Sequence, residues 1–306
     1  MTALNLIAEY VLRKLSQHRP LFVAIQGPQG SGKSYLATHV QSLLQKPPHS
    51  LRVAVLSIDD LYLPHKDLVL LAAANSDNPL LNGRGQPGTH DVDLGVQILS
   101  ALKTGNSTIE LPRFDKSLHS GEGDRLPVDG TGTIVVQPPR IDVVIFEGWC
   151  VGFSPISEQE ILSRWRGVWD SERRKLNRGL DNICRPADLK IINEYLKQYS
   201  RLWSFFDIFV QLKPEEPPFS HVSRYEVVYK WRLDQEHNMK SRNGGKGMSD
   251  TAVQSFVDRY IPGYVFFGDF PPLRHEENLE GTSIQAVSGL SIVLDEARNV
   301  IASSTF

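Results

Sequence analysis

The sequence predicts a three-layer α/β/α fold in which helices cover both faces of a mainly parallel central sheet. Apolar runs without polar alternation indicate strands that are buried on both faces, as parallel strands are. Segments of helical periodicity separate these runs, and alternating strands and helices form parallel sheets. In such folds ligands lie at the carboxyl ends of the strands. The strands are expected at 21–26, 51–58, 141–146 and 205–212.

The remaining elements follow the same patterns along the chain. Helical periodicity predicts helices at 35–44, 66–74, 224–240 and 250–260. A closing pair of strands is expected at 290–295 and 300–303, around the turn 296–299. The stretches 75–90 and 112–132 are dense in glycine, proline and charge. They are expected to be functional loops, because plain connectors are usually shorter.

The 306 residues are sufficient for one domain with a large core. Three segments within it differ in periodicity or composition: an N-terminal helix at 1–19, a charged helical insertion at 157–197 and a lid region at 224–248. Leu4, Ile7, Val11 and Leu15 recur at helical spacing in the first segment. Neither a secretory signal nor a transit peptide is expected there.

Composition narrows the class of protein. The 33 Lys and Arg against 35 Asp and Glu give a net charge of -2, so no overall field favours nucleic acid or anionic membranes. Cys150 and Cys184 fit neither a disulfide framework nor a metal cluster, which favours a reducing compartment. The longest apolar run, 68–74, is shorter than the roughly 20 residues of a membrane span. We expect a cytoplasmic protein, with the nucleus left open.

A phosphate-binding motif follows the first strand. Gly27, Pro28, Gln29, Gly30, Ser31, Gly32, Lys33 and Ser34 satisfy G-x-x-x-x-G-K-[ST] between a strand and a helix. Glycines let backbone N–H groups turn toward phosphates, and the helix start adds positive potential. Lys33 is expected to reach the β- and γ-phosphates and Ser34 to bind Mg²⁺. A purely structural turn is the alternative.

Acidic residues end the next two strands. Asp59 and Asp60 leave the second strand side by side, so we expect one of them, Asp59, to point into the site and orient an acceptor hydroxyl. The alternative is a helix N-cap, which suits Asp60 better. Glu147 follows the third strand and is expected to contact Mg²⁺ through water, with an ordinary surface residue as the alternative.

The two glycine-rich loops carry the candidate acceptor-binding residues. A small anionic acceptor requires cations, and each loop supplies them on backbone rich in glycine. For any single residue, a solvated loop position or a cap is an equal alternative. The candidates, with the second acid of the pair above, are Asp60, Arg84, His90, Arg113, Lys116 and Arg125.

A basic helix late in the chain resembles a lid. Arg232 lies in the run WRLDQEH, and Lys246 lies in the glycine-rich turn beyond it. Arg232 is expected to stabilise the transferring phosphate as an arginine finger, and Lys246 to join it on closure. Solvent-facing basic residues on an amphipathic helix are the alternative for both.

Taken together, these motifs resemble the plant glycerate 3-kinase family and its fungal ATP-binding relatives, near pantothenate kinase, uridine kinase and phosphoribulokinase. The resemblance runs over about 26–270 and depends on blocks that occur in order. The blocks are GPQGSGKS, SIDDLYL, GRGQPGTHD, LPRFDKSLHSGEGDR, FEGWCVGF, WRLDQEH and GMSDTAVQSFVDRYIPGY.

The resemblance implies a P-loop NTPase fold of the kinase type, ATP with Mg²⁺ as the donor, and a small hydroxylated acceptor such as glycerate. Roles transfer to Lys33, Ser34, Asp59 and Glu147. The segment 157–197 matches no motif of the glycerate enzymes, so the chain is closer to the fungal branch, and the acceptor stays open.

The leading hypothesis is therefore an ATP-dependent small-molecule kinase. One alternative is a nucleotide switch of the GTPase type, but the sequence contains no base-reading N-K-x-D element. Another is an ATP-binding regulatory module with weak or no kinase activity, for which Asp59 and Glu147 would be superfluous. The oligomeric state is left open.

Overall fold

The computed structural model describes residues 1–15, 19–219, 221–242, 244–245, 247–268 and 287–306. A six-stranded sheet lies at its centre in the order β10-β9-β8-β1-β7-β2. The edge strand β10 runs antiparallel to β9, and the other neighbouring strands are parallel. The strands are β1 (Leu21–Gln26), β2 (Val53–Ser57), β7 (Val143–Gly148), β8 (Ile208–Pro214), β9 (Ser288–Leu294) and β10 (Val300–Thr305).

Two short hairpins lie outside the central sheet. They pair β3 (Ile109–Glu110) with β6 (Ile134–Val135), and β4 (Phe114–Asp115) with β5 (Asp124–Arg125). Both fall within or next to the predicted loop 112–132.

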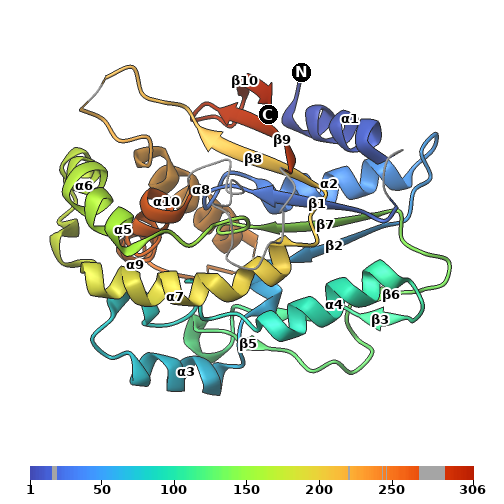
Figure 1. Ribbon diagram of the computed structural model, residues 1–306, viewed down its shortest axis with the longest axis horizontal. Coiled ribbons are helices and arrows are strands. Elements are labelled where there is room, and N and C mark those ends of the chain that lie inside the picture. The colour runs from blue at the N-terminus through green and yellow to red at the C-terminus, as the bar shows by residue number, and fades with distance from the viewer. Residues whose placement is uncertain (16–18, 220, 243, 246, 269–286) are drawn as a thin grey trace.

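Helices cover both faces of the sheet (Figure 1). They are α1 (Ala3–Leu15), α2 (Lys33–Gln45), α3 (His65–Ala74), α4 (Val92–Thr104), α5 (Glu158–Arg164), α6 (Asp170–Leu176), α7 (Pro186–Trp203), α8 (Glu226–Arg242), α9 (Asp250–Asp258) and α10 (Ile261–Phe267). A π-helical turn, Trp165–Trp169, joins α5 to α6.

The predicted fold class is confirmed, with shifts of a few residues at element ends. The third strand continues through Glu147 to Gly148, whereas the sequence placed its end before that acid. Helices α4 and α10 were not predicted. In α10 all seven residues are buried, so no polar face marks the helix in the sequence.

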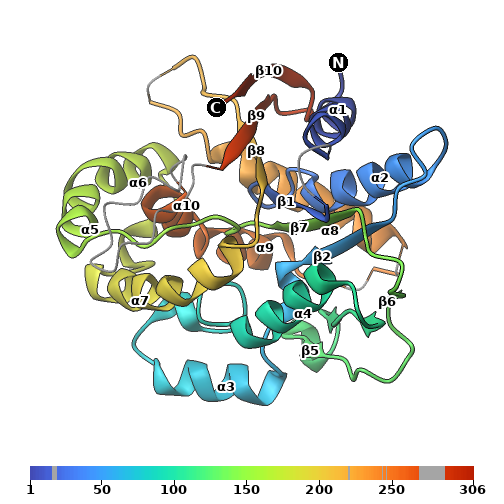
Figure 2. The same cartoon turned by 45° about the vertical axis from the view of Figure 1, so that its right-hand side comes forward.

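The strands feed two hydrophobic cores because successive side chains point to opposite faces. On β1, Phe22 and Ala24 join the core beneath α4, α7 and α10, while Val23 and Ile25 join the core beneath α1 and α2. The N-terminal helix packs on the second core, and Tyr10 Oη lies 2.7 Å from Ser288 Oγ at the start of β9. Figure 2 shows both chain ends on the same side of the molecule, at the top of the view by α1 and β10.

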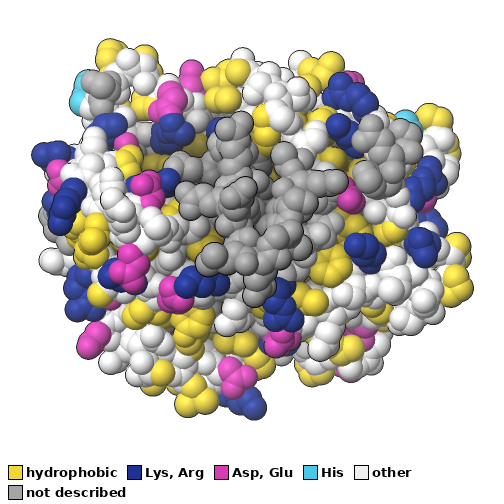
Figure 3. Space-filling model, viewed as in Figure 1, with side chains coloured by type: hydrophobic (Ala, Val, Ile, Leu, Met, Phe, Trp, Pro, Cys, Tyr) yellow, Lys and Arg dark blue, Asp and Glu magenta, His cyan; other side chains and the backbone are white. Residues whose placement is uncertain are grey.

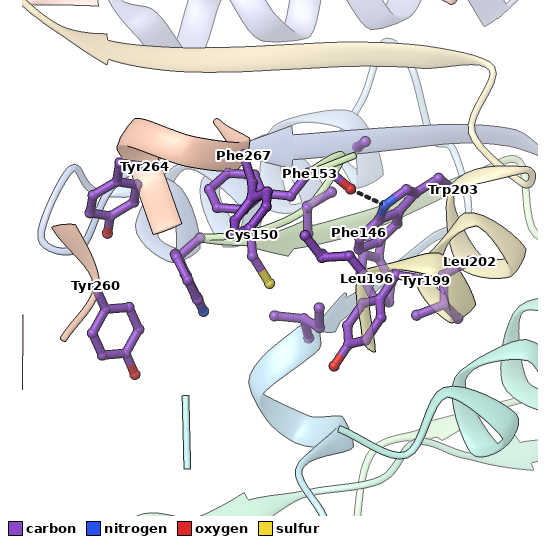
Figure 4. Close-up of a cluster of buried hydrophobic side chains, with 14 of the residues drawn as sticks. Phe146, Cys150, Phe153, Leu196, Tyr199, Leu202, Trp203, Tyr260, Tyr264 and Phe267 are labelled. Carbon is purple, nitrogen blue, oxygen red and sulfur yellow. Dashed lines mark hydrogen bonds between the residues drawn. The ribbon is translucent and has the colours of Figure 1, made fainter. Parts of the chain in front are cut away.

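Helix α7 belongs to the first core rather than to a peripheral appendage. Figure 4 shows Tyr199, Leu202 and Trp203 packed toward Phe146 of β7, and Trp203 Nε1 donates to Phe153 O over 2.9 Å. The helix therefore extends six residues beyond the predicted 157–197 boundary and covers the sheet. The charged run of that segment is partly neutralised locally, as in the Lys175–Glu172 pair at 3.0 Å.

The surface carries both signs of charge. On the face shown in Figure 3, Lys and Arg side chains are interspersed with Asp and Glu, in keeping with the small net charge. Within the described residues, no helix is long and apolar enough to cross a membrane. Cys150 and Cys184 are both free thiols and both buried.

Candidate active site

The site is built at the carboxyl ends of three adjacent strands. Strand β7 lies between β1 and β2, so Glu147 is level with Ile25 on one side and Ser57 on the other. The glycine loop leaves β1 immediately after this level, and Asp59 and Asp60 follow β2. The sheet topology therefore brings together three groups that are far apart in the sequence.

The loop from Gly27 to Ser34 connects β1 to α2, as the motif predicts. Gly30 and Gly32 have φ angles of 73° and 89°, a left-handed conformation that glycine adopts without steric cost. The backbone N–H of Gln29 donates to Tyr264 Oη over 3.1 Å. The loop is thus anchored to α10 as well as to its own helix.

Ser34 and Glu147 form a pair suited to a divalent cation. Ser34 Oγ donates to Glu147 Oε1 over 2.8 Å, and Glu147 is only 3% exposed. Glu147 Oε2 is buried and has no hydrogen-bond partner among the described residues. A buried carboxylate oxygen without a partner is costly unless a ligand binds it. The two side chains therefore fit Mg²⁺, which takes few protein oxygens and completes its shell with water and phosphate.

Asp59, the acid expected to act on the acceptor, pairs with Lys116 of the loop 112–132. Lys116 Nζ lies 2.5 Å from Asp59 Oδ2 in an ion pair whose side chains are 54% and 30% exposed. Burial favours the neutral acid, but Lys116, Lys33 and His90 together outweigh it and hold the pKa of Asp59 well below its usual range. Asp59 is therefore a stable anion within reach of the lysine of the phosphate loop.

Asp60 has the opposite electrostatic character. Burial and the adjacent Asp59 charge raise the pKa of Asp60 to about 6. The alternative that Asp60 caps a helix is wrong. Ser57 Oγ caps the short turn Ile58–Leu61 by accepting from Asp59 N, and Pro64 precedes α3.

His90 is buried beside this acid pair. Its ring stacks on Tyr62 at 4.5 Å, and His90 Nδ1 lies 2.7 Å from Tyr199 Oη. Burial lowers the pKa of His90 to about 4, so the ring is neutral at physiological pH. His90 Nε2 is buried without a partner among the described residues.

The predicted loop arginines are held by the protein itself. Arg84 donates to the carbonyls of Gly121 and Glu122, which joins the two loops. Arg125 lies 2.9 Å from Asp91 Oδ2 and also donates to Tyr62 O, so it fixes the start of α4. Both arginines thus hold the loops in place through contacts within the protein.

Arg113 is directed to a different part of the same loop. Its Nη2 donates to Thr131 Oγ1 over 2.7 Å, and Asp129 Oδ1 lies 3.9 Å from it. Of the predicted loop cations, Lys116 is the one paired with a candidate catalytic acid.

The predicted lid arginine is also paired. Arg232 Nη1 lies 2.8 Å from Glu236 Oε2, and the two side chains are 13% and 1% exposed. The preceding residue, Trp231, packs its backbone against Gly30. Lys246, predicted to join Arg232, lies outside the described residues.

Three tyrosines complete the site and were not predicted. Tyr62 and Tyr199 contact His90, and Tyr260 packs beside Gly85 and Trp149. All three are at most 2% exposed. Their signal in the sequence is weak, because buried aromatic residues are typical of any core.

A phosphate loop, a serine–glutamate pair suited to Mg²⁺ and a separate aspartate anion, Asp59, define a P-loop phosphotransferase. No family model matches the chain. The chain is 34% identical over 293 residues to the probable ATP-dependent kinase TDA10 of Saccharomyces cerevisiae, covering 94% of this chain and 88% of the relative. It is 36% identical over 274 residues to the uncharacterized kinase mug58 of Schizosaccharomyces pombe, covering 87% and 90%.

The chain therefore belongs to the family of ATP-dependent kinases that includes TDA10 and mug58. It is also similar to a plant enzyme, the chloroplastic D-glycerate 3-kinase of Arabidopsis thaliana, with 32% identity over 92% of this chain and 54% of the relative.

A solved structure agrees with this family. The D-glycerate 3-kinase of Cryptococcus neoformans superposes with a TM-score of 0.83 at 37% identity, over 100% of both chains. The predicted fold and the predicted enzyme class, an ATP-dependent kinase, are confirmed.

Proposed function

We propose that the protein transfers the γ-phosphate of MgATP to a hydroxyl of a small anionic metabolite, with D-glycerate as the first acceptor to test. The Asp59–Lys116 pair beside the phosphate loop carries this proposal, because it offers one group for a hydroxyl and one for a carboxylate. The names of two relatives, both D-glycerate 3-kinases, support the choice of acceptor.

The donor half of the site holds ATP. Backbone N–H groups of the loop 27–34, in which Pro28 has none, would bind the phosphates, and Lys33 would neutralise charge on the β- and γ-phosphates. Ser34 Oγ and Glu147, whose Oε2 has no partner among the described residues, would hold Mg²⁺. When bound, Mg²⁺ supplies further neutralisation of the phosphate charge.

The acceptor half depends on a change of partner by Lys116. When the acceptor carboxylate binds Lys116, Asp59 loses its main cationic neighbour, and its pKa rises toward the range of a proton acceptor. The acceptor hydroxyl oxygen then attacks the γ-phosphorus, and the bond to the β–γ bridging oxygen breaks to release ADP. The hydroxyl proton passes to Asp59. Arg232, released from Glu236, would stabilise the charge on the transferring group.

The proposal extends to the organisation of the chain and its location. We propose one kinase domain over 1–306, with 224–248 as its lid. The small net charge and the free thiols fit a cytoplasmic or nuclear protein with ATP and a small molecule, rather than nucleic acid, as partners.

An acceptor panel tests the proposal. ADP release is measured with D-glycerate, L-glycerate, pantothenate, uridine and no acceptor, and the phosphorylated product is identified by mass. We expect one hydroxy acid to raise turnover at least about a hundredfold over basal hydrolysis, and Lys33→Ala to lose at least about a hundredfold, on the order of 3 kcal/mol. Absence of stimulation by every compound, or full turnover in Lys33→Ala, would contradict it.

The proposed role of Glu147 in Mg²⁺ binding is tested separately. Chelation of divalent ions should abolish transfer, and Glu147→Gln should raise the Mg²⁺ concentration for half-maximal rate by about tenfold or more. Glu158→Gln, an exposed glutamate paired with Lys190, should match the unchanged protein. An unchanged Mg²⁺ requirement in Glu147→Gln would remove Glu147 from the metal site.

A further inference from the structure

The turn between β9 and β10, residues 295–299, contacts the phosphate loop. Arg298 Nε donates to the carbonyl oxygen of Gly30 over 2.7 Å, although the two residues are 268 positions apart. The N–H of the next residue, Ser31, donates to Pro28 O over 3.2 Å. The peptide group between Gly30 and Ser31 is therefore held at both ends.

The same guanidinium reaches helix α8. Arg298 Nη2 donates to Trp231 O over 3.2 Å and lies 3.5 Å from Asp234 Oδ2. Gly30 itself packs on this helix so closely that a Cβ atom there would lie 2.5 Å from the carbonyl carbon of Trp231. Arg298 thus joins the phosphate loop to α8 at the residue before Arg232.

Hydrogen bonds on both sides of Arg298 hold the turn in the conformation that directs this residue to the phosphate loop. Glu296 O accepts from Trp231 Nε1 over 2.7 Å, and the Asp295 carboxylate accepts from the backbone and side chain of Asn299. Arg298 has a φ of 67°, an uncommon conformation for a residue with a side chain. Such outliers persist where surrounding contacts hold them, and they cluster at functional sites.

We propose that Arg298 is a positioning residue for the nucleotide, which holds the phosphate loop in its binding shape against α8. A P-loop binds phosphate because its N–H groups are oriented before the ligand arrives. The hydrogen bond from Arg298 to the carbonyl oxygen of Gly30 maintains that orientation. The hydrogen bond is charge-assisted, so it is stronger than one between neutral groups. The C-terminal hairpin is then part of the ATP site.

This inference requires ATP binding but not the proposed acceptor, so its test uses nucleotide affinity alone. The dissociation constants of MgATP and MgADP are measured by calorimetry for Arg298→Ala, Arg298→Lys and Arg201→Ala, alongside the thermal unfolding midpoint of each nucleotide-free protein. Arg201→Ala is the matched control, because it removes an exposed arginine of α7 that pairs with Asp93 of α4.

We expect Arg298→Ala to weaken both nucleotides by about tenfold with little change in the unfolding midpoint. Arg298→Lys, which keeps one charged donor, should recover part of the affinity, and Arg201→Ala should bind like the unchanged protein. Unchanged affinity in Arg298→Ala would overturn the inference, as would an equal loss in Arg201→Ala. If Arg298→Ala does not fold, unchanged affinity in Arg298→Lys overturns it and a severalfold loss supports it.

Discussion

At the scale of single residues, two neighbouring aspartates have opposite electrostatic environments. Asp59 is kept ionised by Lys116, while burial and the Asp59 charge favour the neutral form of Asp60. Pairs of acids whose environments separate their pKa values are typical of active sites. Sequence adjacency predicted that the two would point differently, but not which partner each would meet.

The pKa of Asp60 makes a stability prediction. Its pKa of about 6 in the folded protein lies above the ordinary aspartate value of 3.8, so the native state holds this proton more tightly than the unfolded state does. The resulting stabilisation is present below about pH 4 and is lost as the pH rises through 6. The Asp60→Asn variant cannot lose this stabilisation, because its side chain does not titrate. Its free energy of unfolding, relative to that of the unchanged protein, should therefore rise by ~1–2 kcal/mol between pH 4 and pH 7.5, after allowance for solvent screening.

Urea unfolding at the two pH values measures this difference. Asp93→Asn, an exposed aspartate paired with Arg201, serves as the control and should show no change in its difference from the unchanged protein. If the free energies of unfolding of Asp60→Asn and the unchanged protein differ by the same amount at both pH values, the raised pKa of Asp60 is contradicted. His90 acts in the other direction, because its lowered pKa of about 4 costs stability as the pH falls below about 6.5.

At the scale of elements, helix α7 supports the loop 83–91 from outside the predicted motifs. The Tyr199 hydroxyl accepts from Gly88 N over 2.9 Å and bonds His90 Nδ1, and Tyr199 is 1% exposed. One hydroxyl thus satisfies a half-buried backbone donor and a buried ring nitrogen. This contact connects α7 to the loop 83–91.

Tyr199→Phe should therefore destabilise the protein by about 1–3 kcal/mol, because a buried ring nitrogen and a half-buried N–H group lose a partner while the aromatic ring remains. The change is measured as the free energy of unfolding in urea. Tyr195→Phe, on the same helix and next to Gly88, should cost less than about 0.5 kcal/mol. Equal costs for the two variants would show that the Tyr199 hydroxyl is not a structural link.

Most elements of the sheet could be predicted from periodicity, whereas contacts between elements could not. Strands β1 and β7 form apolar runs because both of their faces are buried, and the edge strand β2 forms one although part of it is half-buried. Helix α4 was missed although both its ends carry recognisable signals, the Asp91 N-cap and Gly105 in the left-handed conformation. Arg298 gave no signal, since a charged residue in a turn is usually solvated.

At the scale of the whole molecule, the strand order assembles the site. Placing β7 between β1 and β2 brings Glu147 to Ser34, and the long loop after α4 brings Lys116 to Asp59. The motif predicted the proposed phosphate-binding residues 27–34 because they are consecutive. The proposed acceptor half combines distant loops, so the sequence could nominate its residues without predicting their pairings.

The central claim is that Asp59 acts on the acceptor, separately from ATP binding. Its most direct test compares Asp59→Asn with the unchanged protein in two measurements: MgATP affinity by calorimetry and single-turnover phosphate transfer to the acceptor found in the panel. For Asp59→Asn we predict a MgATP dissociation constant within about twofold of that of the unchanged protein and a transfer rate lower than its rate by about a hundredfold or more. A transfer rate within about threefold of the unchanged protein would contradict the account.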